Sequence, residues 1–203
     1  MKDVAGIVLA GGAASRIGGE KALLPFRGGV LLDAVIARAA PQVSVLAINV
    51  AREDESRYRT QFSSRPLIAD DFPKGTGPLA GVIAGLEWLA KQGSAQWLAT
   101  FPCDTPFLPH DLVAQLMAGA GDAPVFARDE ARMHGVCAVW PVSCGARLRE
   151  GIEQGRLRSL HSAMEALGGE TRLIRAEAHA FFNINTAEDL ATAEQLVKTI
   201  PSP

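Results

Sequence analysis

The stretch Val-Ala-Gly-Ile-Val-Leu-Ala-Gly-Gly, residues 4–12, decides the fold of this chain. The part from Val4 to Ala10 is apolar, and hydrophobic and polar positions do not alternate in it. Such a run is typical of a strand that is buried on both faces, as in a parallel sheet. Gly11 and Gly12 follow directly, and glycine lets a backbone approach a ligand closely. The stretch therefore predicts a buried strand that ends in a ligand-binding loop.

The rest of the chain alternates between apolar strand patterns and helix patterns. We expect strands at 43–50, 66–69, 97–101, 123–127, 136–140 and 171–176. We expect helices at 31–40, 53–62, 79–92, 110–117, 144–154, 159–167 and 186–199. This alternation indicates an α/β fold with a Rossmann-like, open, mainly parallel sheet flanked by helices. The 203 residues suit one domain over 1–200, followed by a tail at 201–203.

The balance of charge excludes two classes of partner. Twenty Lys and Arg stand against 22 Asp and Glu, which gives a formal net charge of −2. Nucleic acids and anionic membranes are bound by clustered Lys and Arg, which this chain lacks. No stretch approaches the roughly 20 apolar residues that span a bilayer. We therefore expect no nucleic acid and no membrane as a partner.

Cysteine and histidine spacing predicts no metal or redox centre. The three cysteines show no paired spacing, and their odd number without a secretory signal indicates a cytoplasmic protein. Cys103 has no evident base partner, so we do not expect a nucleophilic thiol. The four histidines also lack metal-ligand spacing, and we expect surface or ordinary structural roles for all of them: His110, His134, His161 and His179.

The loop after the first strand carries two cations at positions suited to phosphate binding. Small residues let successive N–H groups point at phosphate oxygens, and Arg16 and Lys21 supply the charge to neutralise a triphosphate. Ala22 follows Lys21, so the segment is not the Gly-x-x-x-x-Gly-Lys-Ser/Thr loop, and it is not Gly-x-Gly-x-x-Gly either. The alternative is an ordinary turn with two surface cations.

Polar residues follow at the ends of the next predicted strands, where open parallel sheets bind ligands. They are Asn49, Asp70 and Asp104. Asp104 is flanked by prolines and is well placed for Mg²⁺, which takes one or two carboxylates together with substrate phosphates. Asp70 precedes Asp71, and adjacent residues of an extended chain point opposite ways, so we expect one of them to face the site. The alternative for each acid is a turn or helix-cap role.

Two downstream segments complete the candidate site. The stretch from Gly75 to Gly81 allows a second substrate to lie against the backbone, and Gly81 is its candidate binding residue. Alternation puts Asn183 and Asn185 on one face and buries Ile184 opposite. The alternatives are a helix start with proline in the first turn and capping of the last helix by Asn185 or Thr186.

With these residues, the chain resembles the molybdenum cofactor guanylyltransferase (MobA-type) family, nearly from end to end. The motifs that carry the resemblance occur in order: Leu-Ala-Gly-Gly with a later Arg, Gly and Lys, then Asp and Gly-Pro-Leu-Ala-Gly, then Pro-Cys-Asp-Thr-Pro, then Asn-x-Asn-Thr-x-Glu-Asp-Leu. The family loop commonly has Ser, Met and Asp where this chain has Ala14, Ile17 and Glu20.

The resemblance implies roles for individual residues. The residues that are implied to contact the nucleotide and its phosphates are Leu9, Ala10, Gly11, Gly12, Arg16 and Lys21. Asn49 and Asp70 are implied for the guanosine part, and Asp104 for the nucleotide and Mg²⁺. Asn183 and Asn185 are implied for the pterin-phosphate side. Arg16, Lys21 and Asp104 are the expected catalytic residues.

The resemblance also implies a reaction: GMP passes from GTP to molybdenum-bound molybdopterin, which gives the guanine dinucleotide cofactor and pyrophosphate. Cofactor-delivery and acceptor proteins are implied as partners. Related cytidylyltransferases usually carry Ala-Ala-Gly where this chain has Ala10-Gly11-Gly12, which favours guanine. The alternatives are a related nucleotidyltransferase that uses CTP or another triphosphate with a different phosphate acceptor, a non-catalytic nucleotide-binding protein, and a small dehydrogenase-like domain.

Overall fold

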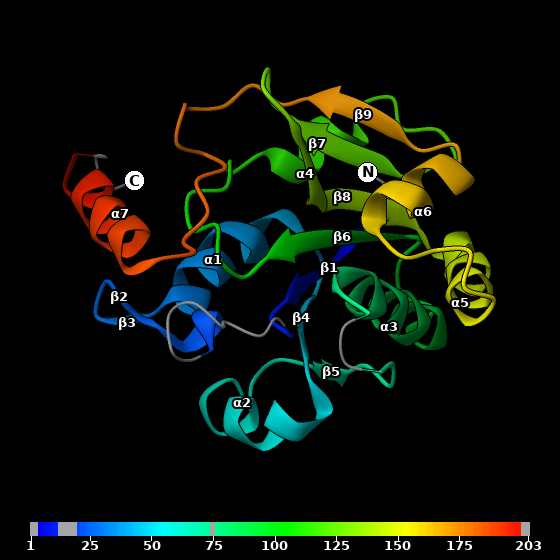
Figure 1. The fold of residues 1–203 in the computed structure, drawn as a ribbon, viewed down its shortest axis with the longest axis horizontal. Coiled ribbons are helices and arrows are strands. Elements are labelled where there is room, and N and C mark those ends of the chain that lie inside the picture. Colours follow the sequence, from blue (N-terminus) through cyan, green and yellow to red (C-terminus); the bar gives the residue numbers. More distant parts are fainter. Residues whose placement is uncertain (1–3, 12–19, 74–75, 200–203) are drawn as a thin grey trace.

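The main sheet of the computed structural model has seven strands in the order β5-β4-β1-β6-β8-β7-β9 (Figure 1). The structure describes residues 4–11, 20–73 and 76–199. The strands of this sheet are β1 Val4–Leu9, β4 Leu46–Val50, β5 Leu67–Ala69, β6 Trp97–Pro102, β7 Val125–Arg128, β8 Met133–Pro141 and β9 Glu170–Leu173. The predicted α/β class is confirmed.

Strand β8 runs against the direction of its neighbours. Strands β5, β4, β1 and β6 pair in parallel, and so do β7 and β9. Strand β8 pairs antiparallel with both β6 and β7. The sheet is therefore mainly parallel, as predicted, but β8 begins at the edge where β1, β4 and β6 end.

The start of β8 is irregular as well as reversed. The pairing of β7 with β8 jumps from Phe126 opposite Ala138 to Ala127 opposite His134. Three residues of β8, 135–137, consequently have no partner on β7, which is the geometry of a bulge. The sequence predicted this strand only from residue 136 onwards, so its first residues were missed.

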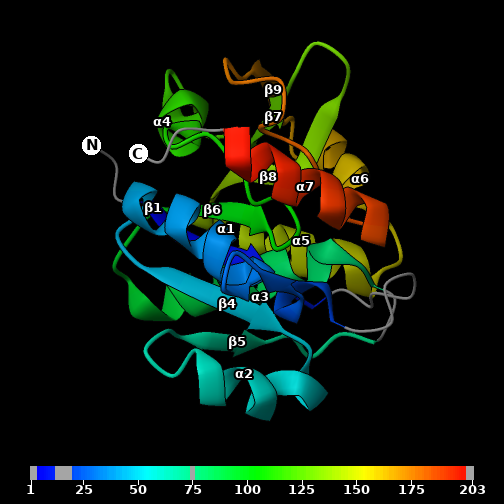
Figure 2. The same ribbon diagram turned by 90° about the vertical axis from the view of Figure 1, so that its left-hand side faces the viewer.

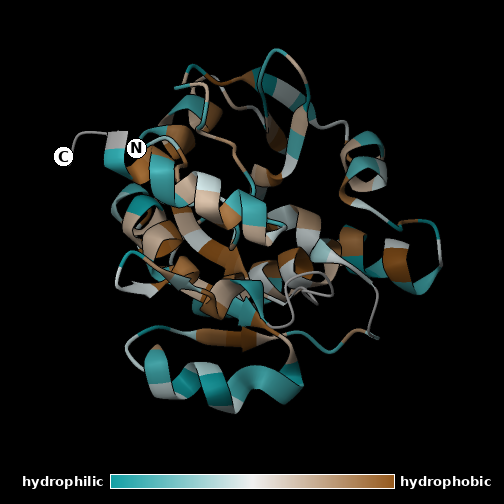
Figure 3. Cartoon of the chain, turned by 60° about the vertical axis from the view of Figure 1, so that its left-hand side comes forward, coloured by the Kyte–Doolittle hydropathy of each residue, from teal (hydrophilic) through white to brown (hydrophobic). Residues whose placement is uncertain are grey.

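Helices cover both faces of the sheet (Figure 1). One face packs against α1 Leu31–Ala39, α2 Glu55–Gln61 and α4 Leu112–Met117. The other face packs against α3 Pro78–Gln92, α5 Gly145–Glu153 and α6 Leu160–Ala166. Alternate residues of β1 serve the two cores, since Val4 and Val8 belong to the first and Ile7 and Leu9 to the second. Figure 3 shows the resulting distribution, with hydrophobic strands inside and a hydrophilic α2 outside.

Helix α3 lies unusually close to the sheet because glycines face it. A Cβ atom on Gly85 would stand 2.8 Å from Leu98 Cδ2, and one on Gly81 would stand 2.3 Å from Asn49 Oδ1. Both distances are shorter than real Cβ contacts. The close approach carries the first turn of α3 to the carboxyl end of β4.

A hairpin and the last helix form a third, smaller core. Strands β2 Pro25–Phe26 and β3 Gly29–Val30 pair antiparallel around Arg27 and Gly28, which have φ angles of 54° and 80°. Phe26 packs with residues of α1 and of α7 Ala187–Thr199. Figure 2 shows α7 lying beside α1. The sequence predicted no strand here.

Four short 3₁₀ helices connect the described elements, at η1 Lys21–Leu23, η2 Ala40–Gln42, η3 Arg52–Asp54 and η4 Val142–Cys144. All predicted helices are present, and their ends lie within a few residues of the expected ones. Over the described ranges, no helix is long and apolar enough to cross a bilayer. A single domain over 1–200 stays a prediction.

Candidate active site

A cavity of about 380 Å³ opens at the edge of the sheet where β1, β4, β5 and β6 end and β8 begins. Seven of the predicted site residues line it: Leu9, Gly11, Lys21, Asn49, Asp70, Asp104 and Asn183. Ala10 and Gly81 are buried behind this lining. Gly12 and Arg16 lie outside the described residues. The structure thus brings together side chains that are up to 174 residues apart, from Leu9 to Asn183.

Asn49 forms the floor of one end of the cavity. It lies within β4 and is 3% exposed. Its Nδ2 donates to Ile68 O at 3.0 Å and to Asp70 Oδ2 at 3.2 Å. Both amide hydrogens are used, which leaves Oδ1 as an acceptor. The missing Cβ of Gly81 makes room for this amide, and a contact of Gly81 with a ligand stays a prediction.

Only the first of the two adjacent aspartates faces the cavity, as predicted. Asp70 lines it, whereas the carboxylate of Asp71 accepts a bond from Arg149 at 3.3 Å. The guanidinium of Arg149 also bonds Glu87 of α3 and lies 4.6 Å from the ring centroid of Phe72. The hydrogen bond from Arg149 is the main reason why the pKa of Asp71 is lowered. Arg149 therefore fixes the segment that carries Asp70.

Lys21 and Asp104 form an ion pair, and both residues line the cavity. The Nζ atom of Lys21 lies 3.1 Å from Asp104 Oδ2 and donates a second, shorter bond to Asn185 Oδ1. The two charged side chains are 21% and 16% exposed. A cation held by two oxygens at the mouth of a cavity is poised to meet a phosphate oxygen. Asn185 contacts Lys21 in this way without lining the cavity itself.

Asn183 and Asn185 share a side of the chain, and Ile184 is fully buried opposite, as predicted. Asn183 Oδ1 accepts a 2.8 Å bond from the hydroxyl of Thr105, which is 1% exposed. The backbone N–H of Ile184 donates to Asp104 O at 2.9 Å. The segment before α7 is therefore tied to the loop after β6.

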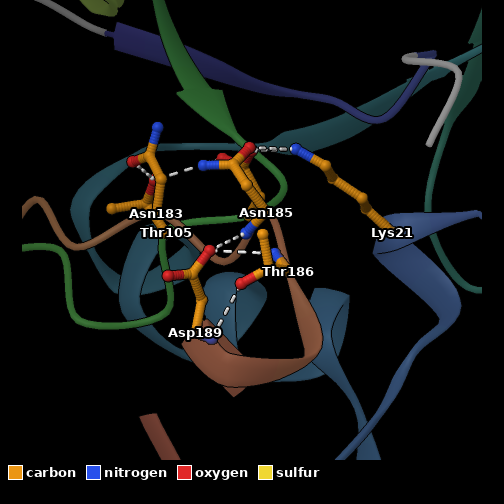
Figure 4. Close-up of polar contacts among 7 residues, drawn as sticks. Lys21, Thr105, Asn183, Asn185, Thr186 and Asp189 are labelled. Carbon is orange, nitrogen blue, oxygen red and sulfur yellow. Dashed lines mark hydrogen bonds and ion pairs between the residues drawn. The ribbon is translucent and has the colours of Figure 1, made fainter. Parts of the chain in front are cut away.

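The predicted cap of the last helix is also present (Figure 4). The carboxylate of Asp189 accepts the N–H groups of Asn185 and Thr186, both at 2.8 Å, and Thr186 Oγ1 accepts the N–H of Asp189 at 3.1 Å. The bond from the Asn185 N–H is the main reason why the pKa of Asp189 is lowered. This cap fixes the backbone of Asn185 and with it the oxygen that holds Lys21.

The sequence did not single out several residues that line the cavity, among them Thr105, His134 and Phe181. His134 lies in the wall built by β8, and the expectation of a surface or ordinary structural role for it stays untested. The sequence assigned β8 to a parallel sheet, and a parallel strand would carry His134 to the far edge. Cys103 behaves as expected, because burial raises the pKa of its thiol to about 12 and keeps it protonated at neutral pH.

The acids of the site suit a shared cation rather than a closed metal centre. Within the described ranges, no group of three or more His, Cys, Asp or Glu comes together to hold a metal ion. Asp104 is a single carboxylate at the open cavity. This donor set fits a hard cation that takes its other ligands from phosphates and water.

An open α/β sheet with a cavity at the carboxyl ends of its parallel strands has the ligand-binding arrangement of this class of fold, and here a Lys–Asp pair lines that cavity. Residues 6–171 match the family described as MobA-like NTP transferase domain. The chain belongs to this family and is a nucleotidyltransferase.

Relatives and solved structures agree with this assignment. The chain is 39% identical to the molybdenum cofactor guanylyltransferase of Mesorhizobium japonicum, over 99% of both chains. It is 40% identical to that of Cereibacter sphaeroides, over 95% of this chain and 96% of the relative. Molybdopterin-guanine dinucleotide biosynthesis protein A from Archaeoglobus fulgidus has the same fold, with a TM-score of 0.80, 24% identity, and coverage of 97% of this chain and 100% of that one.

Proposed function

We propose that this protein transfers GMP from GTP to the terminal phosphate of molybdenum-bound molybdopterin, which releases pyrophosphate. The observation that carries the proposal is the Lys21–Asp104 pair in the lining of a cavity that also contains residues from the ends of β1 and β4 and from the start of β8. The names of the full-length relatives supply the two substrates. The alternative with CTP or another acceptor differs only in what occupies the two ends.

The cavity lies along an edge of the sheet that is wide enough for two substrates side by side. Four inter-strand steps separate β5 from β8, and at about 4.8 Å each they span about 19 Å. We assign the end near β5, β4 and β1 to GTP, because Leu9, Gly11, Asn49 and Asp70 lie there. The free Oδ1 of Asn49 and the carboxylate of Asp70 are acceptors, and guanine offers N–H donors. The end between β6 and β8 is left for the acceptor.

The chemistry needs alignment and charge neutralisation more than proton transfer. The attacking phosphate is already anionic at neutral pH, so no general base is required, and no histidine or free thiolate contacts the Lys21–Asp104 pair among the described residues. Lys21 neutralises the phosphates on which negative charge accumulates. Asn185 and Asp104 orient its ammonium group. Arg16 and Gly12 are proposed to assist on the phosphates.

Mg²⁺ is the proposed cofactor, held by Asp104 together with substrate phosphates. When bound, it supplies Lewis-acid stabilisation of the phosphate oxygens. Lys21 bonds Asp104 Oδ2, so the carboxylate that would hold the ion also orients the ammonium group.

Two further parts of the proposal concern the surroundings of the protein. We propose a cytoplasmic location, in line with three free, buried cysteines. We also propose that cofactor-delivery and acceptor proteins bring molybdopterin and collect the product. Pull-down of the chain with purified delivery and acceptor proteins tests the second point.

The proposed function is tested by pyrophosphate release with GTP, CTP, UTP and ATP, each with molybdopterin and Mg²⁺. We expect release with GTP alone. Asp104→Asn should abolish it, whereas Asp111→Asn, which changes an exposed aspartate outside the cavity, should leave it unchanged. Release with CTP would favour the alternative enzyme, and GTP binding without any release would favour a non-catalytic binding protein.

A further inference from the structure

The wall of the cavity opposite the proposed GTP end contains a histidine whose orientation is fixed on two sides. His134 Nε2 lies 2.8 Å from Asp129 Oδ2. The His134 ring stacks on the Phe181 ring, with 4.0 Å between centroids and 11° between planes. Its side chain is 8% exposed, yet it lines the cavity. A ring held in this way presents one defined polar atom to a ligand.

The partner of His134 is itself anchored. Asp129 Oδ1 accepts the N–H groups of Ala131 and Arg132 at 2.8 and 2.7 Å. These bonds, with the one from His134, lower the pKa of Asp129 to about 2, so the carboxylate is ionised. Burial lowers the pKa of His134, against the pull of Asp129, which favours the neutral ring at pH 7. The bond to a carboxylate puts the proton of the neutral ring on Nε2 and leaves Nδ1 as an acceptor.

This wall is connected to the proposed reaction centre. Phe181 and Asn183 alternate along the segment before α7, and both line the cavity. Asn183 Oδ1 is taken by Thr105, and Thr105 directly follows Asp104. A substrate with its phosphate at the Lys21–Asp104 pair therefore has the rest of its body beside Asn183, Phe181 and His134.

We infer that His134 determines specificity for the acceptor: its Nδ1 accepts a hydrogen bond from a ring N–H of a planar nitrogen heterocycle bound at the His134–Phe181 wall. Asp129 acts through His134 as a positioning residue. The inference rests on the proposed function, in which that heterocycle is the planar pyrimidine ring of the pterin of molybdopterin. Planar heterocycles suit a wall of aromatic side chains, and a fixed acceptor selects those with an N–H at the matching edge.

Two assays with the whole protein test this inference separately from the proposed function. Binding of 6-hydroxymethylpterin is followed by quenching of the pterin fluorescence, and GTP binding is followed by calorimetry. His134→Phe keeps an aromatic ring beside Phe181 but removes Nδ1. We expect it to weaken pterin binding about three- to tenfold, the range of one hydrogen bond, and to leave GTP affinity unchanged.

Two further variants keep the test informative if His134→Phe is poorly folded. Asp129→Ala releases the ring of His134 and should also weaken pterin binding, since Asp129 is 38% exposed and its loss leaves no buried charge. His134→Gln retains an acceptor oxygen and should restore part of the affinity. His161→Phe is the matched control, because His161 is exposed on α6, away from the cavity. Thermal unfolding and GTP affinity report folding for every variant.

The outcomes separate the two proposals. Unchanged pterin binding in both His134→Phe and Asp129→Ala would overturn the inference, and so would a loss of GTP affinity instead. The same holds if the unaltered protein does not bind the pterin. If the unaltered protein binds the pterin through His134 but releases no pyrophosphate with GTP and molybdopterin, the proposed function fails while the binding site stands.

Discussion

Replacing Gly81 by alanine tests whether the amide of Asn49 controls the nucleotide end of the cavity. The added Cβ would stand 2.3 Å from Asn49 Oδ1, 2.8 Å from its Cγ and 3.0 Å from Leu9 Cδ2. Asn49 is almost fully buried, so its amide has nowhere to go without breaking its bonds to Ile68 O and Asp70 Oδ2. We expect Gly81→Ala to displace this amide.

The magnitude follows from the two contacts at stake. An added methyl group in a well-packed region costs about 1–3 kcal/mol, and each hydrogen bond that is lost costs about 1 kcal/mol. If the amide moves aside, the clash is relieved and the two bonds are lost, which costs about 2 kcal/mol. In a protein of this size such a loss lowers the melting temperature by about 4–8 °C. GTP affinity should fall about tenfold, which corresponds to about 1.4 kcal/mol for a misplaced polar contact.

Differential scanning calorimetry and GTP titration measure both effects. Gly121→Ala is the matched control, because a Cβ there meets nothing within 4 Å and its φ is not positive. A Gly81→Ala protein with unchanged GTP affinity would show that Asn49 does not contact the nucleotide. A lower melting temperature with normal GTP affinity would show that Gly81 contributes to packing and not to GTP binding.

Three further predictions concern the centre and the acceptor end. Lys21→Met should weaken GTP binding at least about tenfold, measured by calorimetry. The control Lys91→Met changes an exposed residue at the end of α3 and should leave GTP binding unchanged. If Lys21→Met bound GTP as tightly as the unaltered protein, Lys21 would not belong to the site. Asp189→Ala removes two bonds to backbone N–H groups and should lower the free energy of unfolding in urea by about 1–2 kcal/mol and also lower kcat. Glu188→Ala should change neither quantity. A normal kcat in Asp189→Ala would show that the helix cap does not contribute to catalysis. The folded-state pKa of Asp129 is about 2 against an ordinary 3.8, so its contribution to stability is present above pH 3.8 and is lost as the pH falls towards 2. The stability of Asp129→Ala should therefore fall less steeply over that pH range than the stability of the unaltered protein. The same pH dependence in both proteins would contradict the hydrogen bonds to Asp129.

Local patterns were enough to predict much of the lining of the candidate site. The alternation of Asn183, Ile184 and Asn185 follows from the geometry of an extended chain and needs no knowledge of the fold. Asp70 and Asp104 follow short apolar runs, and parallel strands bring such ends to one edge. Their assembly around one cavity thus follows from the α/β pattern itself.

Long-range pairing decided what the sequence could not reveal. The run from 136 to 140 is equally apolar in either direction, so nothing local indicates that β8 runs antiparallel between β6 and β7. Because β8 runs antiparallel, His134 lies at the edge of the sheet where the cavity opens. Gly81 shows a second limit, because the sequence does not reveal that its missing Cβ makes room for the side chain of Asn49. The β2–β3 hairpin was missed because Arg27 adopts a positive φ, which its residue type does not suggest.

The reversed strand explains how one sheet edge can serve two different substrates. The ends of parallel strands present loops and backbone N–H groups, which suit phosphates and a nucleoside. The start of an antiparallel strand with a bulge presents side chains at 133–137 instead, together with backbone at 135–137 that has no partner on β7. The Lys21–Asp104 pair stands at the boundary between the two kinds of edge, after β1 and β6. Changes in β8 should therefore alter the choice of acceptor while they leave the binding of the triphosphate intact.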